Sequence, residues 1–141
     1  MRILALDPGS VRVGVAISDE LGVIAQPLEF IPAEPFADFL RRLKQILAEK
    51  QVELILVGMP RNMDGSYGPA ALKVQEFVAV LKTALATPVQ TWDERLTSVQ
   101  ANRLLSEAKV RRDKRKGKVD QMAAAILLQS YLDARGSGAM E

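Results

Sequence analysis

Acidic side chains stand at three places in this sequence where apolar segments begin or end. Asp7 ends the first apolar segment, Asp93 and Glu94 end a later one, and Asp120 starts an apolar stretch near the C-terminus. Two carboxylates about 4 Å apart repel each other by about 4 kcal/mol at an effective dielectric constant near 20, so a cluster of them takes up protons or holds a cation. The sequence therefore predicts a cation site wherever the fold brings these acids together.

The chain contains neither cysteine nor histidine. This excludes Ser-His-Asp and Cys-His nucleophiles, His/Cys zinc sites, thiol redox centres and disulfides. A site built from carboxylate oxygens alone selects Mg²⁺ or Mn²⁺. Such ions activate water and stabilise the leaving oxygen in phosphodiester hydrolysis, so this chemistry is the first candidate.

Basic side chains are concentrated in one short segment, which we call the basic segment (residues 109–118). It contains seven cations and a single acid, whereas the other 131 residues contain 12 cations and 16 acids. Such a concentration indicates either a solvated loop or a contact with a polyanion such as nucleic acid. We expect a mobile arm that binds nucleic acid through Lys109, Arg111, Arg112, Lys114, Arg115, Lys116 and Lys118.

Three further arginines lie next to the acidic positions or in a long polar loop. Arg12 and Arg95 stand near Asp7 and Glu94 and could hold a phosphate through bidentate contacts, or could pair with an acid. Arg61 lies in the loop 60–68, which either places backbone amides beside a phosphate or is a turn followed by a helix cap. All three are candidate nucleic-acid contacts.

The apolar patterns predict an α/β domain that would position these residues. Short alternating segments predict three antiparallel strands, the third at an edge because of Pro27, and longer amphipathic stretches predict helices that alternate with two parallel strands. The final helix is apolar around most of its circumference, which predicts burial on several sides. We expect strands at 2–7, 12–18, 23–30, 52–57 and 89–92, and helices at 35–50, 70–85, 96–108 and 119–134.

The length of 141 residues predicts a single domain, residues 1–134, followed by a disordered tail at 135–141. The longest apolar run, residues 122–128, is far shorter than the roughly 20 residues of a membrane-spanning helix. The first residues contain no apolar stretch of the length of a secretory signal. We therefore expect a cytoplasmic protein without a membrane partner.

Four segments resemble the YqgF/RuvX family of Holliday junction resolvases and pre-16S rRNA nucleases. They are LALDPGSVRVGVAISD at 4–19, VGMPRNMDGS at 57–66, DERLTS at 93–98 and KVDQMAAAILLQ at 118–129, and together they extend over nearly the whole chain. The resemblance implies a ribonuclease H-like fold with a five-stranded mixed sheet flanked by helices. It also implies that Asp7, Glu94 and Asp120 are the catalytic residues that bind Mg²⁺ or Mn²⁺, and that the substrate is branched DNA or the precursor of the small-subunit rRNA.

The sequence departs from this pattern at one position. Resolvases of this fold often carry a fourth acid one helical turn beyond the acid of the terminal helix, and Ala123 occupies that position here. Asp93 is the alternative to Glu94, because adjacent strand residues face opposite ways and both should not be ligands.

Because the fourth acid is missing, a catalytically weak nucleic-acid-binding or ribosome-associated module is the second hypothesis for the function. An actin-like phosphotransferase is the third. A junction-resolving enzyme would also require two active sites, and with no cysteine its homodimer would be non-covalent.

Overall fold

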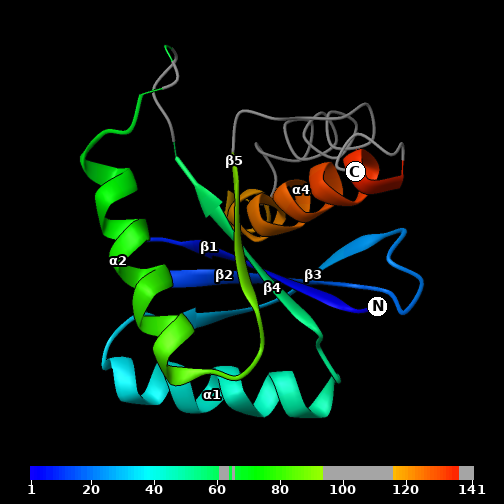
Figure 1. Ribbon diagram of the computed structural model, residues 1–141, viewed down its shortest axis with the longest axis horizontal. Coiled ribbons are helices and arrows are strands. Elements are labelled where there is room, and N and C mark those ends of the chain that lie inside the picture. The colour runs from blue at the N-terminus through cyan, green and yellow to red at the C-terminus, as the bar shows by residue number, and fades with distance from the viewer. Residues whose placement is uncertain (61–63, 65, 94–115, 137–141) are drawn as a thin grey trace.

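A five-stranded mixed sheet forms the centre of the molecule (Figure 1). The computed structural model describes residues 1–60, 64, 66–93 and 116–136, and for residues 116–121 the backbone alone. The order of the strands is β3-β2-β1-β4-β5. The bounds are β1 Ile3–Pro8, β2 Arg12–Ser18, β3 Ala25–Pro32, α1 Phe36–Glu49, β4 Leu54–Met59, α2 Pro69–Ala84, β5 Val89–Asp93 and α4 Lys116–Gly136.

The first three strands form the predicted antiparallel meander, and the later two are parallel to β1. β1 pairs antiparallel with β2, which pairs antiparallel with β3. β4 lies between β1 and β5 and is parallel to both. Pro27 lies in the edge strand β3, at an irregularity in its register with β2, and both are places where a sheet tolerates proline. The predicted fold class is confirmed.

The two faces of the sheet bury different sets of side chains, because successive strand residues point to opposite sides. Leu4 and Leu6 of β1 pack in a core with residues of α1 and α2. Ile3 and Ala5 pack in a second core with residues of α4. The alternation assigns the next position, Asp7, to the α4 face.

α4 is buried on several sides, as its apolar composition predicts. Ala124, Ala125 and Leu128 have no exposed surface, and Leu127, Tyr131 and Leu132 are buried beside them. The helix contacts β1, β2 and β3. The two fully buried alanines let its backbone approach the sheet closely.

Three expectations for the C-terminal part need correction or lie outside the described residues. α4 begins at Lys116 and not at residue 119, so the last three residues of the basic segment are helical. It ends at Gly136, so Arg135 and Gly136 do not belong to a disordered tail, and 137–141 lie outside the described residues. The helix predicted at 96–108 also lies outside them.

In the part of the chain that the structure describes, no helix is long and apolar enough to cross a membrane.

Candidate active site

Asp7 lies at the C-terminal end of β1 in a row of residues that crosses the sheet on the α4 face. Gly14 of β2 is its direct partner, and Phe30 of β3 is the partner of Gly14. On the other side Leu6 pairs with Val57, so the next step of the ladder sets Gly58 beside Asp7. The carboxylate of Asp7 is therefore flanked by two residues without side chains.

Gly14 leaves the space through which α4 approaches Asp7. A Cβ atom at Gly14 would lie 3.8 Å from the Cβ of Asp7 and 3.8 Å from the methyl group of Ala124 on α4. It would also lie 3.6 Å from the ring of Phe30. Asp7 and the terminal helix thus both lie beside Gly14, on the same face of β2.

A cleft of about 270 Å³ opens beside Asp7. The guanidinium of Arg12 lies 3.9 Å from the ring centroid of Phe30, which is a cation–π geometry that fixes an exposed cation. The cleft therefore combines a carboxylate and a guanidinium with the turn that follows β1. Its lining residues are Asp7, Gly9, Ser10, Val11, Arg12, Gly14, Phe30 and Ala123.

The turn between β1 and β2 is held by backbone hydrogen bonds. The amide of Gly9 donates to the carbonyl oxygen of Arg12 at 3.0 Å, and the amide of Ala33 donates to the carbonyl oxygen of Val11 at 2.9 Å. A Cβ atom at Gly9 would lie only 2.7 Å from the Arg12 oxygen, which explains why glycine is needed there. This turn closes a hairpin of β1 and β2, which places Asp7 and Arg12 at one cleft.

α4 carries Asp120 past the same cleft. Ala123 lines the cleft, and Ala124 packs over Gly14. Residues three and four positions apart share one face of a helix, so the backbone of Asp120 lies one turn before these alanines on the same face. Ala123, where the resemblance places a fourth acid, contributes only a methyl group to the cleft.

Asp93 lies on the opposite face of the sheet from Asp7. It pairs with Met59, which packs in the core of α1 and α2, whereas Trp92 packs against the α4 core. β4 lies between β1 and β5, so the C-terminal ends of β1 and β5 lie about 10 Å apart. Glu94 lies outside the described residues.

The other predicted nucleic-acid contacts lie largely outside the described residues. These are Arg61, Arg95, Lys109, Arg111, Arg112, Lys114 and Arg115. Lys116 and Lys118 lie in the first turn of α4, just before Asp120. Among the described residues no group of three acids lies close enough together to hold a metal ion, and the described candidate ligand is Asp7.

Phe30 and Gly14 lie at the cleft but were not among the predicted site residues. The signal for them was present, because a glycine within an alternating strand often marks a close approach of another element. The aromatic residue across the ladder from it could have been found only once the register of β2 and β3 was known.

The comparisons with known proteins agree over nearly the whole chain. A family model described as "RuvX: Holliday junction resolvase" matches residues 1–134. A protein of Halothermothrix orenii named "Putative pre-16S rRNA nuclease" is 51% identical over 133 residues, which are 94% of this chain and 95% of that protein. A protein of the same name from Desulforamulus reducens is 48% identical over 134 residues, 95% of this chain and 98% of that one.

A solved structure has the same fold. The structure described as "T. thermophilus RuvC in complex with Holliday junction substrate" matches with a TM-score of 0.59 and 16% identity. The match covers 97% of this chain and 96% of that one.

Proposed function

The chain belongs to the RuvX family of Holliday junction resolvases, and from this premise we propose that it hydrolyses phosphodiester bonds of structured nucleic acid at the cleft beside Asp7. The observation that supports this most strongly is the meeting of Asp7, Arg12 and the first turns of α4 at one place. A metal-dependent nuclease requires carboxylate ligands for the ion, and Asp7 and Asp120 are the acids that β1 and α4 would contribute here.

The ligand set we propose for Mg²⁺ or Mn²⁺ is Asp7, Glu94 and Asp120. The donors are all carboxylate oxygens, which fit these hard cations. When bound, such an ion supplies an activated water and stabilisation of the leaving oxygen. Glu94 is preferred over Asp93 because alternation along β5 puts Asp93 on the α1 and α2 face, so an extended chain would direct the following residue toward the face of Asp7.

In this proposal Arg12 holds the scissile phosphate. Its guanidinium is fixed over Phe30 and lines the cleft together with Asp7. A guanidinium can hold two oxygens of a phosphate at once, which fixes the scissile group relative to the carboxylates. Gly14 lines the same cleft and adds no side chain to it.

Two substrates are proposed because the relatives carry two kinds of name. Branched DNA follows from the family description and from the RuvC complex, and the rRNA precursor follows from the names of the relatives with about 50% identity. On a four-way junction we propose a non-covalent homodimer, since symmetric incision calls for two active sites. Sedimentation with and without a junction tests this. Paired symmetric nicks made by a strict monomer would contradict it.

A second candidate function, a nucleic-acid-binding module with weak catalysis, is supported by one observation. Ala123 lines the cleft where the resemblance expects a fourth acid, so one ligand fewer is available for a second metal ion.

A cleavage panel tests the two candidates. We expect cleavage of a four-way junction or of a 16S rRNA precursor fragment with Mn²⁺ or Mg²⁺, and none with EDTA. Duplexes and single strands of the same composition are the matched substrates. Binding of the junction or the precursor without cleavage under either metal would favour the binding module.

A further inference from the structure

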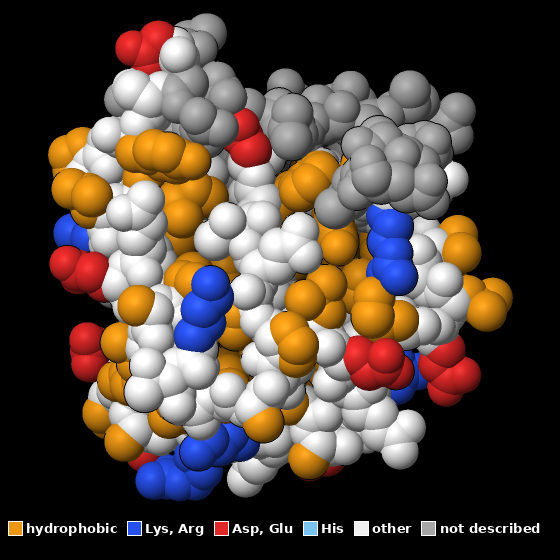
Figure 2. All heavy atoms as spheres, viewed as in Figure 1, with side chains coloured by type: hydrophobic (Ala, Val, Ile, Leu, Met, Phe, Trp, Pro, Cys, Tyr) orange, Lys and Arg blue, Asp and Glu red, His pale blue; other side chains and the backbone are white. Residues whose placement is uncertain are grey.

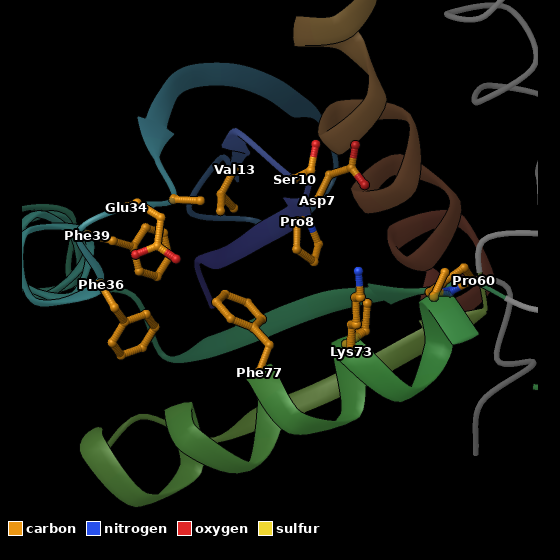
Figure 3. A pocket seen from close by; sticks show the side chains of 14 residues that line it. Asp7, Pro8, Ser10, Val13, Glu34, Phe36, Phe39, Pro60, Lys73 and Phe77 are labelled. Carbon is orange, nitrogen blue, oxygen red and sulfur yellow. The ribbon is translucent and has the colours of Figure 1, made fainter. Parts of the chain in front are cut away.

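A second cavity lies on the other side of Asp7, between α1 and α2. Its volume is about 560 Å³, within the roughly 300–1,000 Å³ of typical small-ligand sites. Figure 3 shows its side chains, which come from the end of β1, from the start of α1 and from the first turns of α2. Asp7, Gly9 and Ser10 line both this cavity and the cleft at Arg12, so the two spaces adjoin at the candidate active site.

Three of the chain's four phenylalanines line this cavity, and the fourth, Phe30, lines the cleft. The ring centroid of Phe39 lies 5.7 Å from that of Phe36 and 5.7 Å from that of Phe77. Phe39 is buried, whereas Phe36 and Phe77 are half-buried and line the open space. Such a wall suits a flat aromatic ligand, because unpaired bases bind by stacking on aromatic side chains.

The charged groups of the cavity lie at its two ends. In Figure 3 the side chain of Lys73 extends from α2 toward Pro8 and Asp7, whereas Glu34 lies with Phe36 and Phe39 at the other end. A lysine binds a phosphate as a point charge, and a carboxylate accepts hydrogen bonds from the N–H groups of a base edge. The polarity of the cavity therefore matches a nucleotide with its phosphate toward Asp7 and its base toward the phenylalanines.

We propose that this cavity receives one unpaired nucleobase of the substrate strand, next to the phosphate held at the cleft. The inference rests on the proposed function, because Asp7, Gly9 and Ser10 connect the two spaces. It adds a requirement that the cleft alone does not impose, namely a nucleotide that has left its base pair. Guanine suits Glu34 best, since two neighbouring N–H donors on its pairing edge can meet one carboxylate.

Nuclear magnetic resonance with mononucleotides tests this without cleavage. With only four phenylalanines, the ring signals of Phe36 and Phe77 are separable. In EDTA we expect guanosine 5′-monophosphate at millimolar concentration to shift them, and ribose 5-phosphate to leave them unchanged. Equal shifts with both compounds, or none with either, would overturn the proposal.

A pair of variants tests the location of the binding site: one adds a large side chain inside the cavity and the other adds the same side chain away from it. Ala70 lines the cavity on α2, and Ala79 is exposed on the same helix away from it. Ala70→Phe should abolish the shifts, and Ala79→Phe should leave them as in the wild type. If Ala70→Phe does not fold, Lys73→Gln should weaken guanosine 5′-monophosphate binding about ten-fold, the loss of one charge-assisted contact, and Lys82→Gln should not. Unchanged binding in Ala70→Phe, or in Lys73→Gln, would contradict the assignment.

A trinucleotide with a central guanine distinguishes a substrate strand from a free nucleotide. We expect the trinucleotide to bind more tightly than guanosine 5′-monophosphate, because its further phosphates reach the cleft. Measuring the affinity of both an RNA and a DNA trinucleotide shows which of the two proposed substrate classes binds better. Rejection of both trinucleotides would overturn the proposal. Cleavage without these shifts refutes this inference alone, whereas shifts in a chain that cleaves nothing refute the proposed function alone.

Discussion

At the scale of single residues, the site depends on what is missing around Asp7 as much as on the carboxylate. Gly14 and Gly58 on the neighbouring strands present no side chains, and Ala123 and Ala124 cover the same region from α4. Larger side chains at these positions would fill the space in which a phosphate must lie. The small residues are thus part of the site although they carry no chemistry.

The face assignment of β5 gives a prediction for two adjacent acids. Glu94→Gln should abolish cleavage, because it removes a proposed metal ligand, whereas Asp93→Asn should retain most of the wild-type rate. Asp93 pairs with Met59 on the face opposite Asp7, so its carboxylate is not available to the same ion. Cleavage assays of both variants on one substrate provide the check. The reverse pattern would mean that β5 ends in a bulge.

The residue types and the proximity of Asp7 to Arg12 could be predicted from the sequence, but the contacts between distant segments could not. Asp7 and Arg12 flank a Pro-Gly turn, so their proximity follows from local turn chemistry. The contact of Arg12 with Phe30, and the position of Lys73 near Asp7, depend on strand order and helix packing. No local pattern encodes these, because they join residues that are far apart in the chain.

At the scale of elements, one buried glutamine fixes α4 to the sheet. Gln129 is 3% exposed, and its Oε1 accepts a hydrogen bond of 2.9 Å from the amide of Ala25. Its Nε2 donates to the carbonyl oxygen of Val23 at 3.0 Å and to Asp133 at 2.9 Å. The bonds to Ala25 and Val23 join the helix that carries Asp120 to the end of the β2–β3 turn, and the bond to Asp133 lies within α4.

Gln129→Leu should therefore destabilise the protein. The substitution keeps the approximate size of the side chain but leaves the buried amide of Ala25 without its acceptor, which costs about 1–3 kcal/mol of unfolding free energy. Urea denaturation measures this. Gln75→Leu, an exposed position on α2, is the matched control and should change stability by less than about 0.5 kcal/mol. Equal effects of the two variants would contradict the role of Gln129.

The β2–β3 turn should make stability depend on acid pH. Hydrogen bonds from the amides of Ile24 and Val23 to the carboxylate of Asp19 lower its pKa. Because the folded pKa lies below the unfolded one, this contribution is present at neutral pH and is lost as the pH falls below about 4. The stability difference between wild type and Asp19→Asn should therefore shrink between pH 5 and pH 2. A difference that stays constant over this range would refute the linkage.

The same turn explains why β3 begins two residues later than the sequence pattern predicts. The alternating pattern predicts a strand at 23–30, whereas β3 is Ala25–Pro32. Asp19 holds the amides of Val23 and Ile24 in the turn, and Ile31 pairs with Val13 beyond the expected end. A proline at 32 reads as a terminator, but it is tolerated in an edge strand, so the pattern alone could not set this boundary.

At the scale of the whole molecule, the charges divide the chain into a basic segment and an acidic remainder. On the face shown in Figure 2, one group of Lys and Arg side chains lies over α1 and the others are scattered singly. The first turn of α4 continues the basic segment to Lys118, two residues before Asp120. A phosphate bound by this segment would therefore lie close to the proposed ligands.

Salt titrations measure how much the basic segment contributes to binding. Each phosphate contact contributes about 0.9 to the slope of log affinity against log salt, so changing Arg111, Arg112, Lys114 and Arg115 to alanine should flatten it by up to about 3.6. Four alanines at Arg41, Lys44, Lys50 and Lys82 are the matched control, because these exposed cations lie on α1, at its C-terminal cap and on α2. If only the control set flattens the slope, nucleic acid binds the surface of α1 and α2 and not the basic segment.

The central claim is that the cleft beside Asp7 is a metal-dependent nuclease site, and single-turnover cleavage by Asp7→Asn tests it most directly. The assay uses a four-way junction and a 16S rRNA precursor fragment with Mn²⁺ or Mg²⁺. Affinity is measured in parallel, and Asp38→Asn at an exposed position on α1 is the control. Loss of a metal ligand removes several kcal/mol of transition-state stabilisation, so we predict a fall of about 10³-fold or more with affinity nearly unchanged. An Asp7→Asn variant that cleaves as fast as the wild type would contradict the account.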